Sequence, residues 1–310
     1  MTPATSVLLL TTLTGFGYGL LAWLGLFAAI GILPRSGFFL PVAVVIALAF
    51  SASGLAASML HLGRPERAWR AFSQWRSSWL SREGIVSMAT FPPALAFAVL
   101  WWSEGPMAPA TRAVGLLAAL LGLVTVGCTA MIYASLKPIR QWHNQHTAPD
   151  YLLFALFSGA LLLAALVVGW TGSAAVIAAV ALIGAVASAV AKFAYWRYID
   201  RQPPLASLAS ATGLSTFGEV RPLDRPHFTE NYILREMGFR IARKHAAKLR
   251  RITMVLAFAV PAVMMAGTIS GIVPLVAACA GVVCAMVGLF IERWLFFAEA
   301  THVAALYYGR

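Results

Sequence analysis

The sequence predicts an all-α, polytopic membrane protein, folded as a bundle of eight transmembrane helices. Of its 310 residues, 60% are hydrophobic and only 11% are charged, and the mean hydropathy is +0.80. The apolar residues gather in long runs that match the roughly 20 residues a helix needs to cross a bilayer. Most Lys and Arg residues lie between these runs, where loops are expected, rather than being spread over a soluble surface.

The length criterion gives eight spanning segments. They run approximately over residues 5–33, 38–62, 83–103, 112–136, 150–170, 174–198, 252–269 and 271–306. The first has no basic leader and no small-residue cleavage site, so we expect it to be a retained helix. Pro92 and Pro93 are expected to kink the third. With no convincing internal repeat, the chain is interpreted as one integral membrane domain, 1–310.

The distribution of positive charge predicts the orientation in the membrane. The net charge is +12, and eight spans place both termini, residues 61–84 and the loops 137–149 and 199–251 on one side. Nearly every Lys and Arg falls there, whereas the opposite loops offer only Arg35 and Arg112. The positive-inside rule therefore places both termini on the cytoplasmic side of a bacterial inner membrane. Charge gathered in this way indicates contact with anionic lipid headgroups and no nucleic acid.

The only sizeable extramembrane piece is the loop 199–251. Pro203, Pro204 and the small polar residues up to Gly218 predict irregular structure. Residues 228–251 predict a basic amphipathic helix with apolar residues four apart. Its apolar and basic positions are Ile233, Met237, Ile241, Arg235, Arg240, Arg243, Lys244 and Lys248. Such a helix can lie on lipid headgroups or dock a partner subunit.

Residues 61–84, which we call the polar knot, hold one His, two Glu, five Arg and three Trp between two apolar segments. The Arg and Trp residues are typical of a membrane-edge loop. His61 and Glu83 lie at the ends of the flanking segments, where ionisable residues point to a function. Ser81 is the predicted N-cap of the third helix and would place Glu83 in its first turn. The helix dipole favours a carboxylate there, so Glu83 could also have a purely structural role.

The last segment carries a second group of ionisable residues: Glu292, Arg293, Glu299 and His302. If the helix continues through them, Glu292 and Glu299 share a face, because they are seven residues apart. Buried charges in a membrane either pair with other helices or line a cavity. Both alternatives stay open for Glu292 and Arg293.

The available side chains restrict the chemistry. The sequence has no nucleophile motif, no Gly-rich phosphate loop and no set of metal ligands, and its three cysteines lie in apolar segments without a CxxC pair. A His, a carboxylate and Arg residues beside an apolar cleft suit proton exchange with a lipid-soluble quinone. A bis-His haem is the rival cofactor. Such a haem needs two histidines that face each other within helices. Only His61 and His302 come near this arrangement, and both lie close to the membrane surface, so no haem is expected.

The run from Ser58 to Trp69, with His61, Arg64 and Arg67 inside it, resembles the signature of the DMSO reductase membrane-anchor family, as does Trp79-Leu-Ser-Arg-Glu83. The ending Arg293-Trp-Leu-Phe-Phe is similar too. The resemblance implies a haem-free anchor that reacts with ubiquinone or menaquinone. It also implies a four-cluster, ferredoxin-like iron–sulfur subunit and a molybdopterin catalytic subunit as partners.

Carried over by motif position, the resemblance makes His61, Arg67 and Glu83 the quinone-site residues. The secondary candidates are Arg64, Glu292, Arg293, Glu299 and His302. The basic knot and the long loop 199–251 depart from the periplasmic members of the family, and the acidic residue of the family's last helix does not align cleanly with Glu292.

The predicted orientation selects among the family's activities. A knot that faces the cytoplasm resembles the anchor of cytoplasmic sulfite:quinone oxidoreductase complexes, in which sulfite is oxidised and quinone is reduced. The alternatives are the anchor of a DMSO or polysulfide reductase that oxidises quinol, a proton-coupled transporter that works without partner subunits, and a purely structural tether.

Overall fold

The computed structural model describes residues 4–60, 62, 64–203, 206–214, 216, 218–221, 223 and 244–303. Within these residues, eight helices are long and apolar enough to cross a membrane, as the sequence predicted. They are α1 (Thr5–Ala29), α2 (Phe39–Met59), α3 (Trp79–Ser103), α4 (Pro109–Ala134), α5 (Thr147–Thr171), α6 (Ala175–Arg201), the continuous helix Ala246–Ile269 and α12 (Pro274–Ala298). The helix Ala246–Ile269 comprises α10 (Ala246–Thr253), a π-helical stretch (Met254–Ala259) and α11 (Val260–Ile269). The protein is thus a multi-pass membrane protein with an all-α fold.

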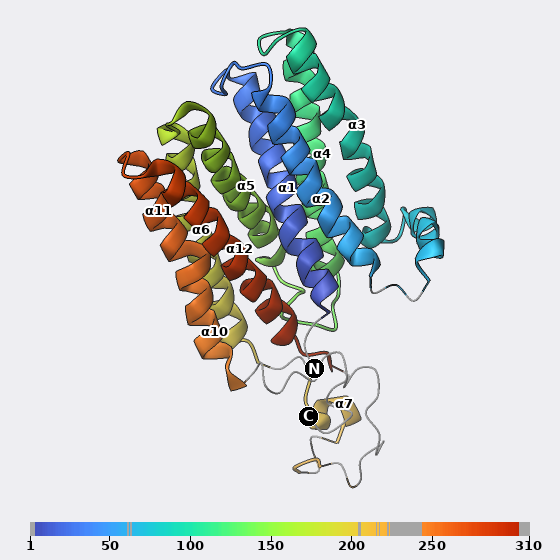
Figure 1. Ribbon diagram of the computed structural model, residues 1–310. Helices are drawn as coiled ribbons and strands as arrows, with labels where there is room; N and C mark the ends of the chain where they lie inside the picture. The colour runs from blue at the N-terminus through green and yellow to red at the C-terminus, as the bar shows by residue number, and fades with distance from the viewer. Residues whose placement is uncertain are drawn as a thin grey trace.

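Helix α1 lies at the centre of the bundle, between α2 and α4 on one side and α5 on the other (Figure 1). Its spanning segment is 72% buried, the largest share of any of the eight. The crossing of α1 and α5 depends on Gly19 and Gly159, because a Cβ atom at either position would overlap the backbone of the other helix. Close approach of two helix backbones at small residues is a common way to pack helices in a membrane.

The start of α1, the short 3₁₀ helix η1 (Pro65–Gln74), α7 (Leu208–Thr212), α10 and the last turn of α12 lie at one end of the bundle (Figure 1). The turns that join α1 to α2, α3 to α4 and α11 to α12 lie at the opposite end. This is the arrangement that eight consecutive spans require, with the polar knot and the loop after α6 on the same side.

The start of the third helix differs from the sequence prediction. It begins at Trp79, and Ser78, not Ser81, is its N-cap: the Ser78 hydroxyl accepts a hydrogen bond from the Ser81 backbone N–H at 3.4 Å. The backbone is extended at Ser78 and already helical at Ser81. Glu83 therefore lies in the second turn, beyond the unpaired N–H groups that would have favoured it in the first.

The last helix is shorter than the prediction of 271–306. It ends at Ala298, with Glu299 as its C-cap, and His302 forms an isolated antiparallel bridge with Ile139. The chain leaves the helix because its next backbone groups bond elsewhere: the Thr301 N–H donates to the Gln141 side chain at 3.2 Å. The expectation that this helix continues through His302 was wrong.

Only part of the predicted helix 228–251 falls within the described residues. Residues 224–243, including Arg240 and Arg243, lie outside them. From Ala246 the chain is helical and runs directly into the membrane-spanning segment Ala246–Ile269.

Candidate quinone site at the polar knot

Within the polar knot, η1 and the turn after it are attached to the start of α3 by several contacts. The Ser81 hydroxyl donates to the Ala71 carbonyl of η1. The Arg82 guanidinium donates to two carbonyl oxygens of the turn after η1, at 2.8 and 2.7 Å. The Phe72 ring packs so closely on Gly84 that a Cβ atom there would lie 2.8 Å from it. Helix η1 therefore covers the end of α3 that carries Glu83.

The predicted site residues are in contrasting environments. Arg64 and Arg67 are exposed, Arg64 as the N-cap of η1 and Arg67 within it. Trp69 and Trp75 are exposed too, as expected of an aromatic belt at a membrane edge. Glu83 is only 4% exposed. His61 lies outside the described residues, so its place beside Glu83 stays a prediction.

Glu83 faces α4, from which the Thr129 hydroxyl donates to Glu83 Oε1 at 2.5 Å. Both side chains are buried. Burying a carboxyl group inside a helix pair is costly unless hydrogen bonds or charges compensate, and ionisable residues at such positions commonly have a function. The contact joins residues 46 positions apart in the sequence, so it depends on how α3 packs against α4.

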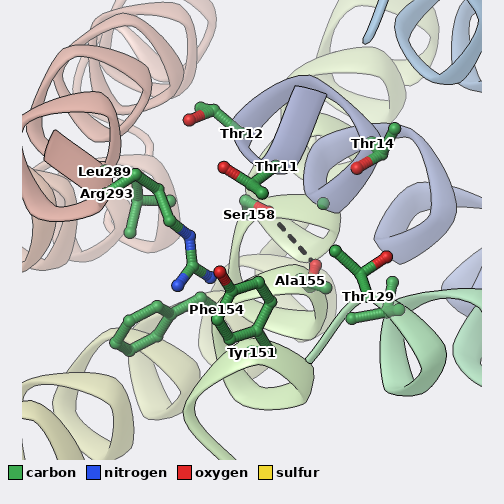
Figure 2. Close-up of a pocket in the computed structure, with 12 residues that line it drawn as sticks. Thr11, Thr12, Thr14, Thr129, Tyr151, Phe154, Ala155, Ser158, Leu289 and Arg293 are labelled. Atoms are coloured by element: carbon green, nitrogen blue, oxygen red, sulfur yellow. Dashed lines mark hydrogen bonds between the residues drawn. The ribbon is translucent and has the colours of Figure 1, made fainter. Parts of the chain in front are cut away.

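A cavity of about 20 Å³ lies next to Thr129, between α1, α4, α5 and α12. Figure 2 shows it ringed by both polar and apolar side chains. They include Thr11, Thr12, Thr129, Tyr151, Ser158 and Arg293. A volume of about 10–15 Å³ suffices for one water molecule, so this cavity has room for water but not for a quinone ring.

Arg293, on the other side of the cavity, belongs to a buried charge cluster. The Lys192 ammonium of α6 lies 2.5 Å from Glu292 Oε1 of α12, and these side chains are 1% and 0% exposed. Arg293 Nη1 lies 3.5 Å from Glu292 Oε2, and its guanidinium stacks over the Tyr151 ring at 3.6 Å from the centroid. Of the two alternatives left open by the sequence, Glu292 thus pairs with another helix, whereas Arg293 lines a cavity.

Sequence reasoning missed two members of this region, Lys192 and Asp150. Lys192 is the only charged residue of the apolar segment 174–198 apart from Arg197 near its end, and an intramembrane Lys is itself a signal of a paired or functional charge. Asp150 is 4% exposed at the start of α5. In the sequence it marks the boundary of its apolar segment, a position at which exposure is the usual expectation.

Glu299 belongs to a separate, more superficial group. Arg250 of α10 donates to Glu299 Oε1 at 2.8 Å and to Asp200 Oδ2 at 2.6 Å. Burial raises the pKa of the Glu299 carboxyl, and the Arg250 charge opposes this rise. Glu299 therefore ties the ends of α6, α10 and α12 together instead of sharing a site with Glu292. His302 lies beyond this helix end, beside Ile139.

Comparison with known proteins gives a consistent result. The DMSO reductase anchor subunit (DmsC) family profile matches residues 5–309. Over 99% of both chains, the sequence is 33% identical to a sulfite dehydrogenase subunit of Allochromatium vinosum. It is also 33% identical to the anaerobic dimethyl sulfoxide reductase chain YnfH of Escherichia coli, over 36% of this chain and 39% of that one.

Proposed function

Because the chain belongs to the DMSO reductase anchor subunit family and is a membrane anchor of an oxidoreductase complex, we propose that it passes electrons between an iron–sulfur subunit and the quinone pool. A molybdopterin subunit would carry the catalytic centre for the other substrate. This chain supplies no electron carrier of its own in the proposal, and no haem. Its part is to hold the quinone and to exchange protons with it.

The observation that carries the proposal is the buried Glu83 carboxyl beneath the polar knot. Reduction of a quinone consumes two protons, and the carbonyl oxygens need hydrogen-bond donors while charge develops on them. Glu83 can exchange a proton, and Thr129 fixes its carboxyl group. His61 and Arg67 complete the proposed site by motif position, with Arg64 as a further candidate at the membrane edge.

The test is Glu83→Gln in the assembled complex. We expect the complex to assemble, and activity with a soluble artificial acceptor at the partner subunits to persist, while quinone-linked turnover falls by roughly 100-fold or more, the range of a lost acid–base group. Glu104→Gln is the matched control, because Glu104 is exposed at the opposite end of the same helix. His61→Ala should behave like Glu83→Gln. Full quinone turnover in both variants would remove the proposal.

We further propose that the protein lies in a bacterial inner membrane, with both termini and the polar knot on the cytoplasmic side. The support is the concentration of Lys and Arg on that side of the bundle, since positively charged loops are retained inside. A fluorescent protein fused after Arg310 should be bright, and alkaline phosphatase fused there should be inactive. The opposite result would mean that the termini and the polar knot, and with them the partner subunits, lie on the periplasmic side.

The proposed substrate of the partner subunits is sulfite. It is supported by the full-length similarity to a protein named as part of a sulfite dehydrogenase and by the predicted cytoplasmic orientation. Membranes that contain the complex should reduce quinone when sulfite is added. If sulfite gives no quinone reduction, and quinol is instead oxidised when DMSO or polysulfide is added, the alternative suggested by the relative YnfH is favoured.

The loop 199–251 is proposed to hold the iron–sulfur subunit, because it is the largest extramembrane piece and lies on the knot side. Changing Arg240, Arg243 and Lys244 to Glu should release the partner subunits without preventing membrane insertion. Copurification of the partners with this variant would favour lipid contact as the role of the basic segment.

A further inference from the structure

The cavity beside Thr129 contains buried polar groups that the protein itself leaves unpaired. Within the described residues, the Thr12 hydroxyl and the Tyr151 hydroxyl have no hydrogen-bond partner, although Thr12 is 5% exposed and Tyr151 is 3% exposed. Both line the cavity. A buried hydroxyl without a partner is costly, and in native proteins such groups are usually satisfied by ordered water.

The size and chemistry of the cavity fit water. Its volume of about 20 Å³ exceeds what one water molecule needs, and several hydroxyl groups and a guanidinium surround it. Figure 2 shows the Tyr151 hydroxyl and the Arg293 guanidinium close together on one side, with Thr129 on the other. Cavities that stay empty are typically apolar throughout, whereas the lining of this one mixes apolar side chains with hydroxyl groups and a guanidinium.

The position of the cavity suggests what the water does. On one side, Thr129 reaches from the cavity lining to the Glu83 carboxyl. On the other side, Arg293 reaches from the lining to Glu292, which is paired with Lys192. The cavity is therefore the gap in an otherwise continuous chain of buried polar groups that runs from α6 and α12 to α3.

We propose that this cavity holds ordered water, and that the water connects the Lys192–Glu292–Arg293 cluster to Glu83 as a proton route to the quinone. That the route ends at Glu83 and the quinone rests on the proposed function of Glu83. The electrons for quinone reduction come from the iron–sulfur partner. The route supplies the two protons that the reduction consumes: taken up from bulk water, they pass along water and hydroxyl groups to Glu83 and then to the reduced quinone oxygens. Arg293 keeps its own proton and orients the water.

The water is tested first, by a measurement that does not depend on quinone chemistry. Radiolytic hydroxyl labelling of the full-length protein in H₂¹⁸O marks buried side chains that touch bound water. Tyr151 and Phe154, which line the cavity, should be labelled, and the buried Phe97 should not. If Tyr151 and Phe154 are as unreactive as Phe97, the cavity is dry and the inference is wrong.

The route is tested with variants that remove the unpaired hydroxyls and preserve side-chain shape. Thr12→Val combined with Tyr151→Phe should lower quinone-linked kcat by roughly 10-fold and raise its solvent deuterium isotope effect, because proton delivery then limits the rate. The quinone KM should not change. Thr111→Val is the matched control: the buried Thr111 hydroxyl, at the far end of α4, likewise has no hydrogen-bond partner within the described residues.

These results separate the two proposals. Labelled water with unchanged kcat and isotope effect in the double variant would leave the water as a structural element and overturn the route. A wild-type complex that does not react with quinone at all would overturn the proposed function, and with it the destination of the route, whatever the labelling shows.

Discussion

The polar knot and the Lys192–Glu292–Arg293 cluster compensate their charges in opposite ways. In the knot, four of the five Arg side chains are exposed, and three of the five lie over neighbouring Trp rings, for example Arg76 over Trp75 at 5.4 Å from the centroid. In the cluster, the charges are at most 5% exposed and are paired between or within helices. The charges of the knot are dense in sequence but mostly exposed, whereas those of the cluster are sparse in sequence and buried. Density of charge along the chain is therefore a poor guide to which charges the fold depends on.

The largest expected effect lies in the cluster. Lys192→Met leaves Glu292 buried without its ammonium partner, and breaking one side of a buried ion pair typically costs about 3–5 kcal/mol. The variant should show a lower yield of monodisperse protein and a lower thermal midpoint in detergent. Lys192→Met combined with Glu292→Leu should recover part of the loss, because the buried carboxylate is removed and the one charge left in the cluster, Arg293, still lies over the Tyr151 ring.

The matched substitution in the knot is Arg67→Met, which also replaces a cation by an apolar side chain but at an exposed position. It should leave the thermal midpoint nearly unchanged. If Arg67→Met destabilises the protein as much as Lys192→Met, burial does not separate the two regions and the comparison fails.

An intermediate effect is expected where the two regions approach each other, at Glu83. Thr129→Val removes the hydroxyl that donates to the Glu83 carboxyl, and an unsatisfied buried polar group costs about 1–3 kcal/mol. The thermal midpoint should fall, and quinone turnover should fall with it. Thr125→Val is the control: the Thr125 hydroxyl donates to the Leu121 carbonyl of its own helix and lies 3.4 Å from the Thr90 hydroxyl of α3, so it also joins the two helices but contacts no carboxylate among the described residues. Equal losses in both variants would mean that the contact with Glu83 has no special role.

The eight helices could be predicted from sequence because a spanning segment must satisfy its backbone hydrogen bonds internally, which makes length and hydropathy sufficient signals. The ends of the helices are less predictable. Ser78 and Ser81 are equally good caps by residue type, and the choice depends on the contacts between η1 and α3. The end of α12 depends on Gln141, a residue 160 positions away from Thr301.

The candidate site was only partly predictable for a related reason. Glu83 could be singled out because it is ionisable beside an apolar segment. Its burial against Thr129 could not be predicted, since nothing in the sequence indicates which face of α4 meets α3. The pairing of Glu292 with Lys192 is of the same kind: each charge is visible in the sequence, but the partner is a property of the packing.

Small effects on stability are expected at the positions of the knot where an Arg side chain lies over a Trp ring. Arg76→Gln removes an exposed cation over the Trp75 ring, an interaction worth about 0.5–1 kcal/mol at exposed sites. Arg82→Gln should cost more than this, because Arg82 lies 4.3 Å from the Trp79 centroid and also donates to two backbone carbonyls. Thermal unfolding of the two variants under identical conditions gives the order directly. If Arg76→Gln proves the more damaging of the two, the stacked Trp rings, and not the backbone contacts of Arg82, hold the knot on α3.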